Sequence, residues 1–124
     1  MVDVFDYMKA ANEQRITLVQ IEDPEPVDEL EEICRLPGID MLFFGPADFS
    51  QGIKKPCDFS NPEISECRKR IADTVHRNGK YCGTTGSAEN FEEYKELGYN
   101  LINIISDVTT LGEGYKSALA LINR

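Results

Sequence analysis

The sequence has little positive charge and no long apolar run, and each shortage argues against a class of partner. Its 13 lysines and arginines are outnumbered by 22 aspartates and glutamates, giving a formal net charge of −9. Binding to nucleic acid needs clustered Lys and Arg, so we expect no nucleic-acid partner. No stretch approaches the roughly 18 apolar residues that cross a bilayer, so we expect no membrane partner either.

The few cysteines and the single histidine also carry little functional signal. The four cysteines, Cys34, Cys57, Cys67 and Cys82, show no C-x-x-C spacing, which argues against a zinc site. The first residues lack the basic region and apolar core of a secretion signal, so we expect reduced thiols and a cytoplasmic protein. His76 falls near the end of a predicted helix, where a structural or surface role is expected.

What the sequence does contain is an alternation of short apolar runs with amphipathic stretches. The four runs predict strands over residues 16–21, 41–44, 80–84 and 101–105. Near-continuous apolar strands separated by helices are typical of a parallel sheet. We therefore predict one α/β domain over residues 1–124, in the order α-β-α-β-α-β-α-β-α. The pattern alone leaves open a small open sheet, as in flavodoxins or response regulators, and a piece of a barrel.

Capping and terminating residues mark the predicted helices. Asn61-Pro62-Glu63 supplies a cap, a first-turn proline and an acid for one helix, which Gly79 ends. Ser87 is predicted to cap the next helix, which Gly98 ends. Apolar residues at helical spacing predict the other helices, with these faces: Val4, Phe5, Met8 and Ala11; Val27, Leu30, Ile33 and Cys34; Tyr115, Leu119 and Ile122.

Polar side chains follow the first predicted strand at its carboxyl end. Gln20 and Glu22 are two residues apart, so their side chains share one face of the strand, while Val19 and Ile21 point the other way. Buried strands of α/β proteins place ligand chemistry at this end. The alternative is that Glu22 simply begins the loop that follows.

The second strand runs directly into Gly45-Pro46-Ala47-Asp48, which predicts a tight turn with Asp48 on it. Backbone N–H groups of such a turn can hold an anion. Two carboxylates on neighbouring strand ends, with positions left for water and substrate, suit a hard divalent cation. Glu22 and Asp48 are therefore candidate metal ligands. The later loop 83–87 could hold an anion at a helix terminus or be an ordinary strand-to-helix turn.

Three segments together resemble one enzyme family: residues 18–23, residues 36–40 and the stretch 45–50, which reads G-P-A-D-F-S. The chain is similar over essentially its whole length to the HpcH/HpaI aldolases of the phosphoenolpyruvate/pyruvate barrel superfamily. The resemblance implies half of a TIM (βα)8 barrel, its carboxyl-terminal half, with four parallel strands and flanking helices. It further implies reversible aldol cleavage of a 4-hydroxy-2-keto acid to pyruvate, or a related keto acid, and an aldehyde.

The resemblance also implies roles for individual residues. Glu22 and Asp48 match the family's metal ligands for Mg²⁺, Mn²⁺ or Co²⁺, and Gln20 matches a glutamine beside the bound keto acid. Gly45, Ala47 and Asp48 match the substrate-binding segment, in which backbone N–H groups of Ala47 and Asp48 hold the keto-acid carboxylate. Pro46 has no N–H to offer.

A half-barrel leaves part of the family pattern unmatched. An arginine and a histidine that assist the family's chemistry come from early strands of the barrel, and this chain has no matching segment. A full barrel needs about 250 residues, and half of one leaves a bare inner sheet face and unpaired edges. We therefore expect a homo-oligomer or a partner chain that supplies the other half. The alternative is a truncated or degenerate half-barrel that is inactive alone.

Overall fold

Four short strands form one parallel sheet whose spatial order, β1-β2-β3-β4, is also the chain order. The computed structural model describes residues 3–122. The strands are β1 (Leu18–Ile21), β2 (Met41–Phe44), β3 (Tyr81–Thr85) and β4 (Leu101–Asn103). The helical elements are α1 (Val4–Gln14), η1 (Glu25–Glu29), α2 (Leu30–Arg35), α3 (Pro46–Gly52), α4 (Pro62–Arg77), α5 (Phe91–Glu96) and α6 (Asp107–Ile122).

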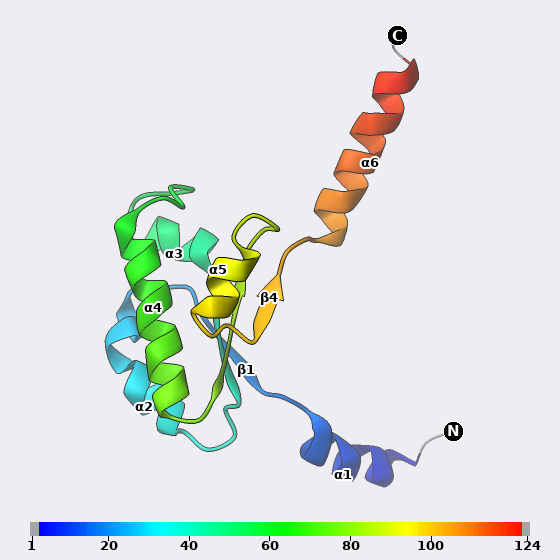
Figure 1. Cartoon of the computed structure of the whole chain (residues 1–124). Coiled ribbons are helices and arrows are strands. Elements are labelled where there is room, and N and C mark those ends of the chain that lie inside the picture. Colours follow the sequence, from blue (N-terminus) through cyan, green and yellow to red (C-terminus); the bar gives the residue numbers. More distant parts are fainter. Residues whose placement is uncertain (1–2, 123–124) are drawn as a thin grey trace.

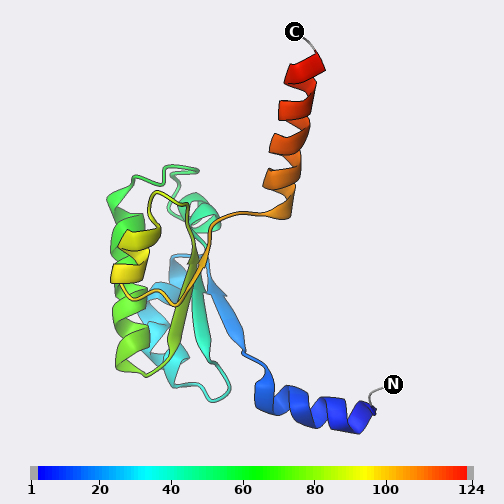
Figure 2. The same ribbon diagram turned by 45° about the vertical axis from the view of Figure 1, so that its right-hand side comes forward.

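Figures 1 and 2 show α2, α4 and α5 packed on one side of the sheet and no helix packed on the other. A doubly wound open sheet has helices on both faces and a point where the strand order reverses. This sheet has neither feature, because its strands are sequential and its helices lie on one side. The flavodoxin-like alternative is therefore wrong, and the arrangement is that of four successive βα units of a barrel.

The core lies between the sheet and its covering helices. Leu42 and Phe44 of β2 and Ile71 and Val75 of α4 are each 0% exposed. Ile21 of β1 belongs to the same cluster, and Val19 packs against it. The predicted direction of Val19 and Ile21 is therefore confirmed.

The opposite face of the sheet carries alternate residues in rows fixed by the strand register. One row aligns Leu18, Met41 and Tyr81, and the next aligns Gln20, Phe43, Gly83 and Leu101. Leu18, Tyr81 and Leu101 are 42%, 55% and 44% exposed. Apolar side chains this open on a strand face are those that a closed barrel would enclose.

The helices at the two ends project away from the sheet, as both ribbon views show. Neither α1 nor α6 has a buried residue. Tyr115, Leu119 and Ile122 have helical spacing, as predicted, yet they are 64%, 57% and 77% exposed. The amphipathic pattern therefore predicted these helices correctly, but their apolar faces have no cover within residues 3–122. None of the described helices is long and apolar enough to cross a membrane.

The predicted start and end signals of α4 are confirmed. The Asn61 side chain accepts from the N–H of Glu63, Pro62 occupies the first turn, and Gly79 follows the helix with φ +65°. In contrast, the predicted cap at Ser87 is wrong. Helix α5 begins at Phe91 after Asn90, and the Asn90 side chain accepts from the Ser87 N–H at 2.7 Å.

Candidate active site at the carboxyl ends of β1 and β2

Gln20 and Glu22 lie on the bare side of the sheet and touch each other. The Gln20 Nε2 group donates to Glu22 Oε2 at 2.7 Å, and both residues are exposed. This contact follows from strand geometry, because residues two apart on a strand point to the same face. The hydrogen bond orients the Glu22 carboxylate and leaves its Oε1 without a partner among the described residues.

Gly45 is the residue that brings the second strand end close to this pair. Its N–H donates to the carbonyl of Ile21 at 2.9 Å, which extends the β1–β2 pairing by one step. A Cβ atom at position 45 would lie 2.9 Å from Gln20 Nε2, 3.2 Å from Glu22 Cβ and 3.4 Å from Glu22 Oε2. Only a residue without a side chain leaves the Gln20–Glu22 pair undisturbed.

Asp48 lies in the first turn of α3, a helix that the sequence analysis predicted as a tight turn. Pro46 is its first residue, and Gly45 precedes it without a side-chain cap. The N–H groups of Ala47 and Asp48 donate no hydrogen bond within residues 3–122, whereas the Phe49 N–H donates to Gly45 at 3.1 Å. A proline at N1 and an acid in the first turn are helix-start signals that could have predicted α3.

The Asp48 carboxylate has one weak partner, the Gln51 Nε2 group at 3.2 Å from Oδ1. No ion pair in the described chain involves Glu22 or Asp48. The two strands that precede these carboxylates, β1 and β2, are paired neighbours. The structure therefore places the predicted acids at adjacent strand ends, where they are exposed. Each has one carboxylate oxygen, Glu22 Oε1 or Asp48 Oδ2, without a hydrogen-bond partner among the described residues.

Whether these residues fit a metal ion depends on the donors available. The described chain holds no cluster of three or more His, Cys, Asp or Glu side chains. Two exposed carboxylates supply hard oxygen ligands and leave the remaining positions to water and substrate, as Mg²⁺ and Mn²⁺ accept. The donor set therefore fits a hard divalent cation and does not fit a structural zinc site, which needs four Cys or His ligands.

The strand register adds two residues to this site: Thr85, from the predicted loop 83–87, and Asn103, which no sequence motif marked. Thr85 pairs with Asn103, one row beyond the row of Gln20. Both side chains are exposed on the bare face, at the level of Glu22. Strand register could not be derived from the sequence, so only their polarity in apolar runs could have pointed to them.

The other reactive side chains have structural surroundings. His76 shares a hydrogen bond of 3.0 Å between Nε2 and the Gly98 carbonyl, in agreement with its predicted role. Cys34, Cys67 and Cys82 are buried free thiols, and Cys57 is exposed. Burial raises the pKa of Cys67 to about 12 and that of Cys82 to about 11. None of the buried thiols is therefore poised as a nucleophile.

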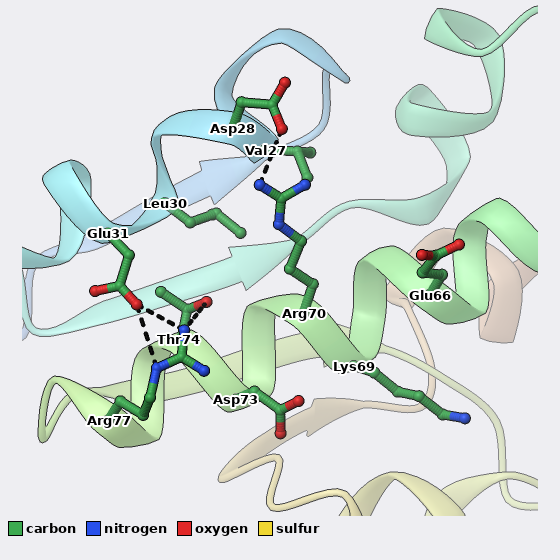
Figure 3. A pocket seen from close by; sticks show the side chains of 10 residues that line it. All are labelled: Val27, Asp28, Leu30, Glu31, Glu66, Lys69, Arg70, Asp73, Thr74 and Arg77. Carbon is green, nitrogen blue, oxygen red and sulfur yellow. Dashed lines mark hydrogen bonds and ion pairs between the residues drawn. The ribbon is translucent and has the colours of Figure 1, made fainter.

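A cavity of about 410 Å³ between α2 and α4 is charged but lies on the helix side of the sheet. Figure 3 shows that each of its arginines contacts one acid: Arg70 contacts Asp28 at 2.9 Å, and Arg77 contacts Glu31 at 2.6 Å. Hydrogen bonds from Asn78 and Arg77 lower the pKa of Glu31. These pairs fasten η1 and α2 to α4, and the other charged residues of the lining, Glu66, Lys69 and Asp73, are two acids and one base with no ion pair among the described residues.

Comparison with known proteins shows which family this chain resembles. Residues 3–112 match the HpcH/HpaI aldolase/citrate lyase family. The chain belongs to this family. It is 34% identical over 120 residues to a hydroxypyruvate/pyruvate aldolase of Delftia acidovorans, covering 96% of this chain and 44% of that protein. It is 30% identical to a 4-hydroxy-2-oxo-heptane-1,7-dioate aldolase of Escherichia coli, covering 93% of this chain and 44% of that protein.

A solved HpcH/HpaI structure gives the same result for the fold. A family protein from Burkholderia cenocepacia superposes with a TM-score of 0.83 at 32% identity, over 96% of this chain and 47% of that one. The citrate synthase SbnG superposes with a TM-score of 0.85 at 24% identity, over 97% of this chain and 49% of that one. The chain spans about half the length of the HpcH/HpaI proteins that it matches, and the fold is half of their TIM barrel.

Proposed function

We propose that this chain is the carboxyl-terminal half of a divalent-metal-dependent aldolase that cleaves a 4-hydroxy-2-keto acid to pyruvate, or a related keto acid, and an aldehyde. The observation that carries the proposal is the meeting of two strand ends. The bonded Gln20–Glu22 pair lies beside Gly45, and the unpaired N–H groups of Ala47 and Asp48 follow directly. The names of the Delftia and Escherichia relatives support the reaction class.

In this proposal each residue has a distinct role toward the keto acid. Glu22 and Asp48 would hold Mg²⁺, Mn²⁺ or Co²⁺. The bound cation would polarise the substrate's 2-keto carbonyl. The N–H groups of Ala47 and Asp48 donate to the keto-acid carboxylate, because a helix start presents donors aimed at an anion. Gln20 has a second N–H, not used by Glu22, with which it can donate to a substrate oxygen.

The proposed cleavage balances within the substrate. The 4-hydroxyl loses its proton, the bond between C3 and C4 breaks, and the aldehyde leaves. The electron pair of that bond remains on the keto acid, which then gains a proton at C3. The N–H donors at the carboxylate fix the orientation in which the charge develops.

The apolar side chains of the bare sheet face need a cover, and this bears on whether the half-barrel is active alone. Leu18, Tyr81 and Leu101 are each more than 40% exposed there. We propose that the other half of a barrel, from a partner chain or a second copy, covers them. A half-barrel that keeps the metal ligands and turns nothing over alone is the second candidate, and the exposed apolar residues of the bare sheet face favour it.

Activity assays separate these proposals. Pyruvate release from a 4-hydroxy-2-keto acid is followed with the purified chain, with Mn²⁺ and with EDTA. Turnover that needs the metal and is lost in Glu22→Gln, but kept in Glu25→Gln, supports the active half. Glu25 is an exposed acid three residues further on, at the start of η1, and is the matched control. Turnover that persists in EDTA contradicts the metal role, and no turnover with Mn²⁺ leaves the inactive half-barrel as the better description.

A further inference from the structure

Arg68 of α4 is a buried cation without an acidic partner. It is 5% exposed, and no ion pair in residues 3–122 includes it. Its Nη1 group donates to Thr84 Oγ1 at 2.6 Å, the one hydrogen bond of its side chain in the described chain. A guanidinium stays charged at any ordinary pH, and a buried charge is normally paired. This arginine therefore lacks a counter-charge in a protein of net charge −9.

Aromatic rings surround the guanidinium instead of carboxylates. Its Cζ atom lies 4.0 Å from the ring centre of Tyr94, 5.2 Å from that of Phe44 and 5.9 Å from that of Tyr99. The Tyr99 hydroxyl donates to the Arg68 carbonyl at 3.0 Å, which fixes the backbone of the arginine. Ring faces attract a cation but do not neutralise it. The rings orient the group and leave its charge available.

The guanidinium borders a small cavity, which we name the Arg68 pocket. It has a volume of about 280 Å³ and is lined by Arg68, Thr85, Ser87, Asn90 and Tyr94, together with Pro46, Phe59 and Gly86. No acidic side chain lines it. No fully buried side-chain nitrogen or oxygen in the described chain lacks a hydrogen-bond partner. The Nε and Nη2 groups of Arg68, which donate to no protein atom, therefore reach solvent in the cavities that Arg68 lines.

We propose that the Arg68 pocket binds an oxyanion group, a carboxylate or a phosphate, with Arg68 as its counter-charge. The planar guanidinium has two free donor groups that match such an anion. Thr85 and Asn90 are polar residues of the same lining. The volume accommodates one such group with a short substituent. None of Gln20, Glu22 and Asp48 lines the pocket, so it is not the proposed metal site, although Pro46 and Thr85 from the neighbouring strand ends belong to its lining.

A neighbouring groove shows why the charge of the wall matters. It also has a volume of about 280 Å³, shares Arg68, Asn90 and Tyr94, and contains Glu93 and Lys69. There the Glu93 carboxylate lies in the wall with Arg68 and Lys69, so it competes with an entering anion for these cations. The Arg68 pocket, whose wall has only the cation, is the side on which an anion gains most.

The test is a titration of the ¹⁵N-labelled chain with sodium phosphate and, separately, with sodium acetate. Ionic strength is held constant with sodium chloride, and no divalent metal is present. We expect saturable amide shifts at Thr85, Gly86 and Ser87 with at least one of the two anions. Saturation by phosphate alone assigns the pocket to a phosphate group, and saturation by acetate assigns it to a carboxylate.

Two variants make the test specific. Asn90→Asp keeps an oxygen to accept from the Ser87 N–H but places a negative charge in the wall, so affinity should fall about tenfold or more. Arg70→Gln removes a cation from the same helix that is exposed and paired with Asp28, and should leave affinity unchanged. Circular dichroism verifies that both variants are folded. Shifts that fail to saturate, that lie elsewhere, or that weaken equally in both variants overturn the proposal. The absence of metal keeps this outcome independent of the aldolase proposal.

Discussion

Replacing Gly45 by alanine tests how closely the two strand ends must approach. The new Cβ atom would lie 2.9 Å from Gln20 Nε2 and 3.2 Å from Glu22 Cβ. The first contact is with the end of a flexible side chain, which can swing away. The second is with an atom fixed to the strand, which must give by a few tenths of an ångström. Gly45 has φ −101°, so alanine causes no backbone strain there.

The expected stability cost of Gly45→Ala is therefore small, about 1 kcal/mol, at the low end for overpacking a site. The effect on metal binding should be larger. Moving Gln20 breaks its 2.7 Å hydrogen bond to Glu22, which orients the proposed ligand. Loss of such an outer-shell partner lowers metal affinity about 10–100-fold.

Isothermal titration with Mn²⁺ and urea unfolding measure the two effects on the same samples. Gly112→Ala is the matched control, because a Cβ there meets nothing within 4 Å. That change should leave Mn²⁺ affinity unchanged and should not destabilise the helix. Unchanged Mn²⁺ affinity in a folded Gly45→Ala variant would refute the reasoning. An affinity loss matched by global unfolding would refute it as well.

Four further predictions concern the fold. Thiol reagents should label Cys57 in the native chain while Cys34, Cys67 and Cys82 stay protected, and mass mapping of the labelled peptides checks this. The raised pKa values of Cys67 and Cys82 mean that the unfolded thiols ionise first, so the free energy of unfolding should fall from pH 9 toward pH 11 in urea titrations. Because the pKa of Glu31 is lowered, its ionised carboxylate should stabilise the fold above the usual carboxyl pKa of 4.5, and this stabilisation should be lost as the pH falls below that value. Glu31→Gln should therefore make the free energy of unfolding depend less on pH in the acid range. Ile71→Ala should cost about 2–5 kcal/mol, since this side chain is fully buried, whereas Leu111→Ala on exposed α6 should cost far less in the same urea assay.

Runs of apolar residues predicted the strands, and pairing with the neighbouring strands decided where each strand begins and ends. Strand β2 is the predicted run 41–44, because every residue of it meets a partner on both sides. Strand β1 is shorter than the predicted run because pairing begins at Leu18. The carbonyl of Thr17 accepts instead from the N–H groups of Asp40 and Met41. Strand β4 ends at Asn103, opposite the last residue of β3, and the apolar Ile104 beyond it is 49% exposed.

Individual side-chain hydrogen bonds and contacts between elements were beyond the reach of sequence patterns. The Asn90 side chain, rather than Ser87, closes the turn before α5, because its Oδ1 reaches back to the Ser87 N–H. The pairing of Arg68 with Thr84 joins residues 16 positions apart on different elements. At the candidate site, the pairing of Gln20 with Glu22 followed from strand periodicity. Their closeness to Gly45 depended on the parallel pairing of β1 with β2, which is a tertiary feature.

The central claim is that Glu22 and Asp48 together hold a divalent cation. Paramagnetic broadening by Mn²⁺ tests it directly in the ¹⁵N-labelled chain. We predict that substoichiometric Mn²⁺ broadens the amide signals of Glu22, Gly45, Ala47 and Asp48 first. This broadening should vanish in Glu22→Gln and in Asp48→Asn and persist in Glu25→Gln. Broadening that spreads over the acidic surface, or that survives in both ligand variants, would contradict the claim.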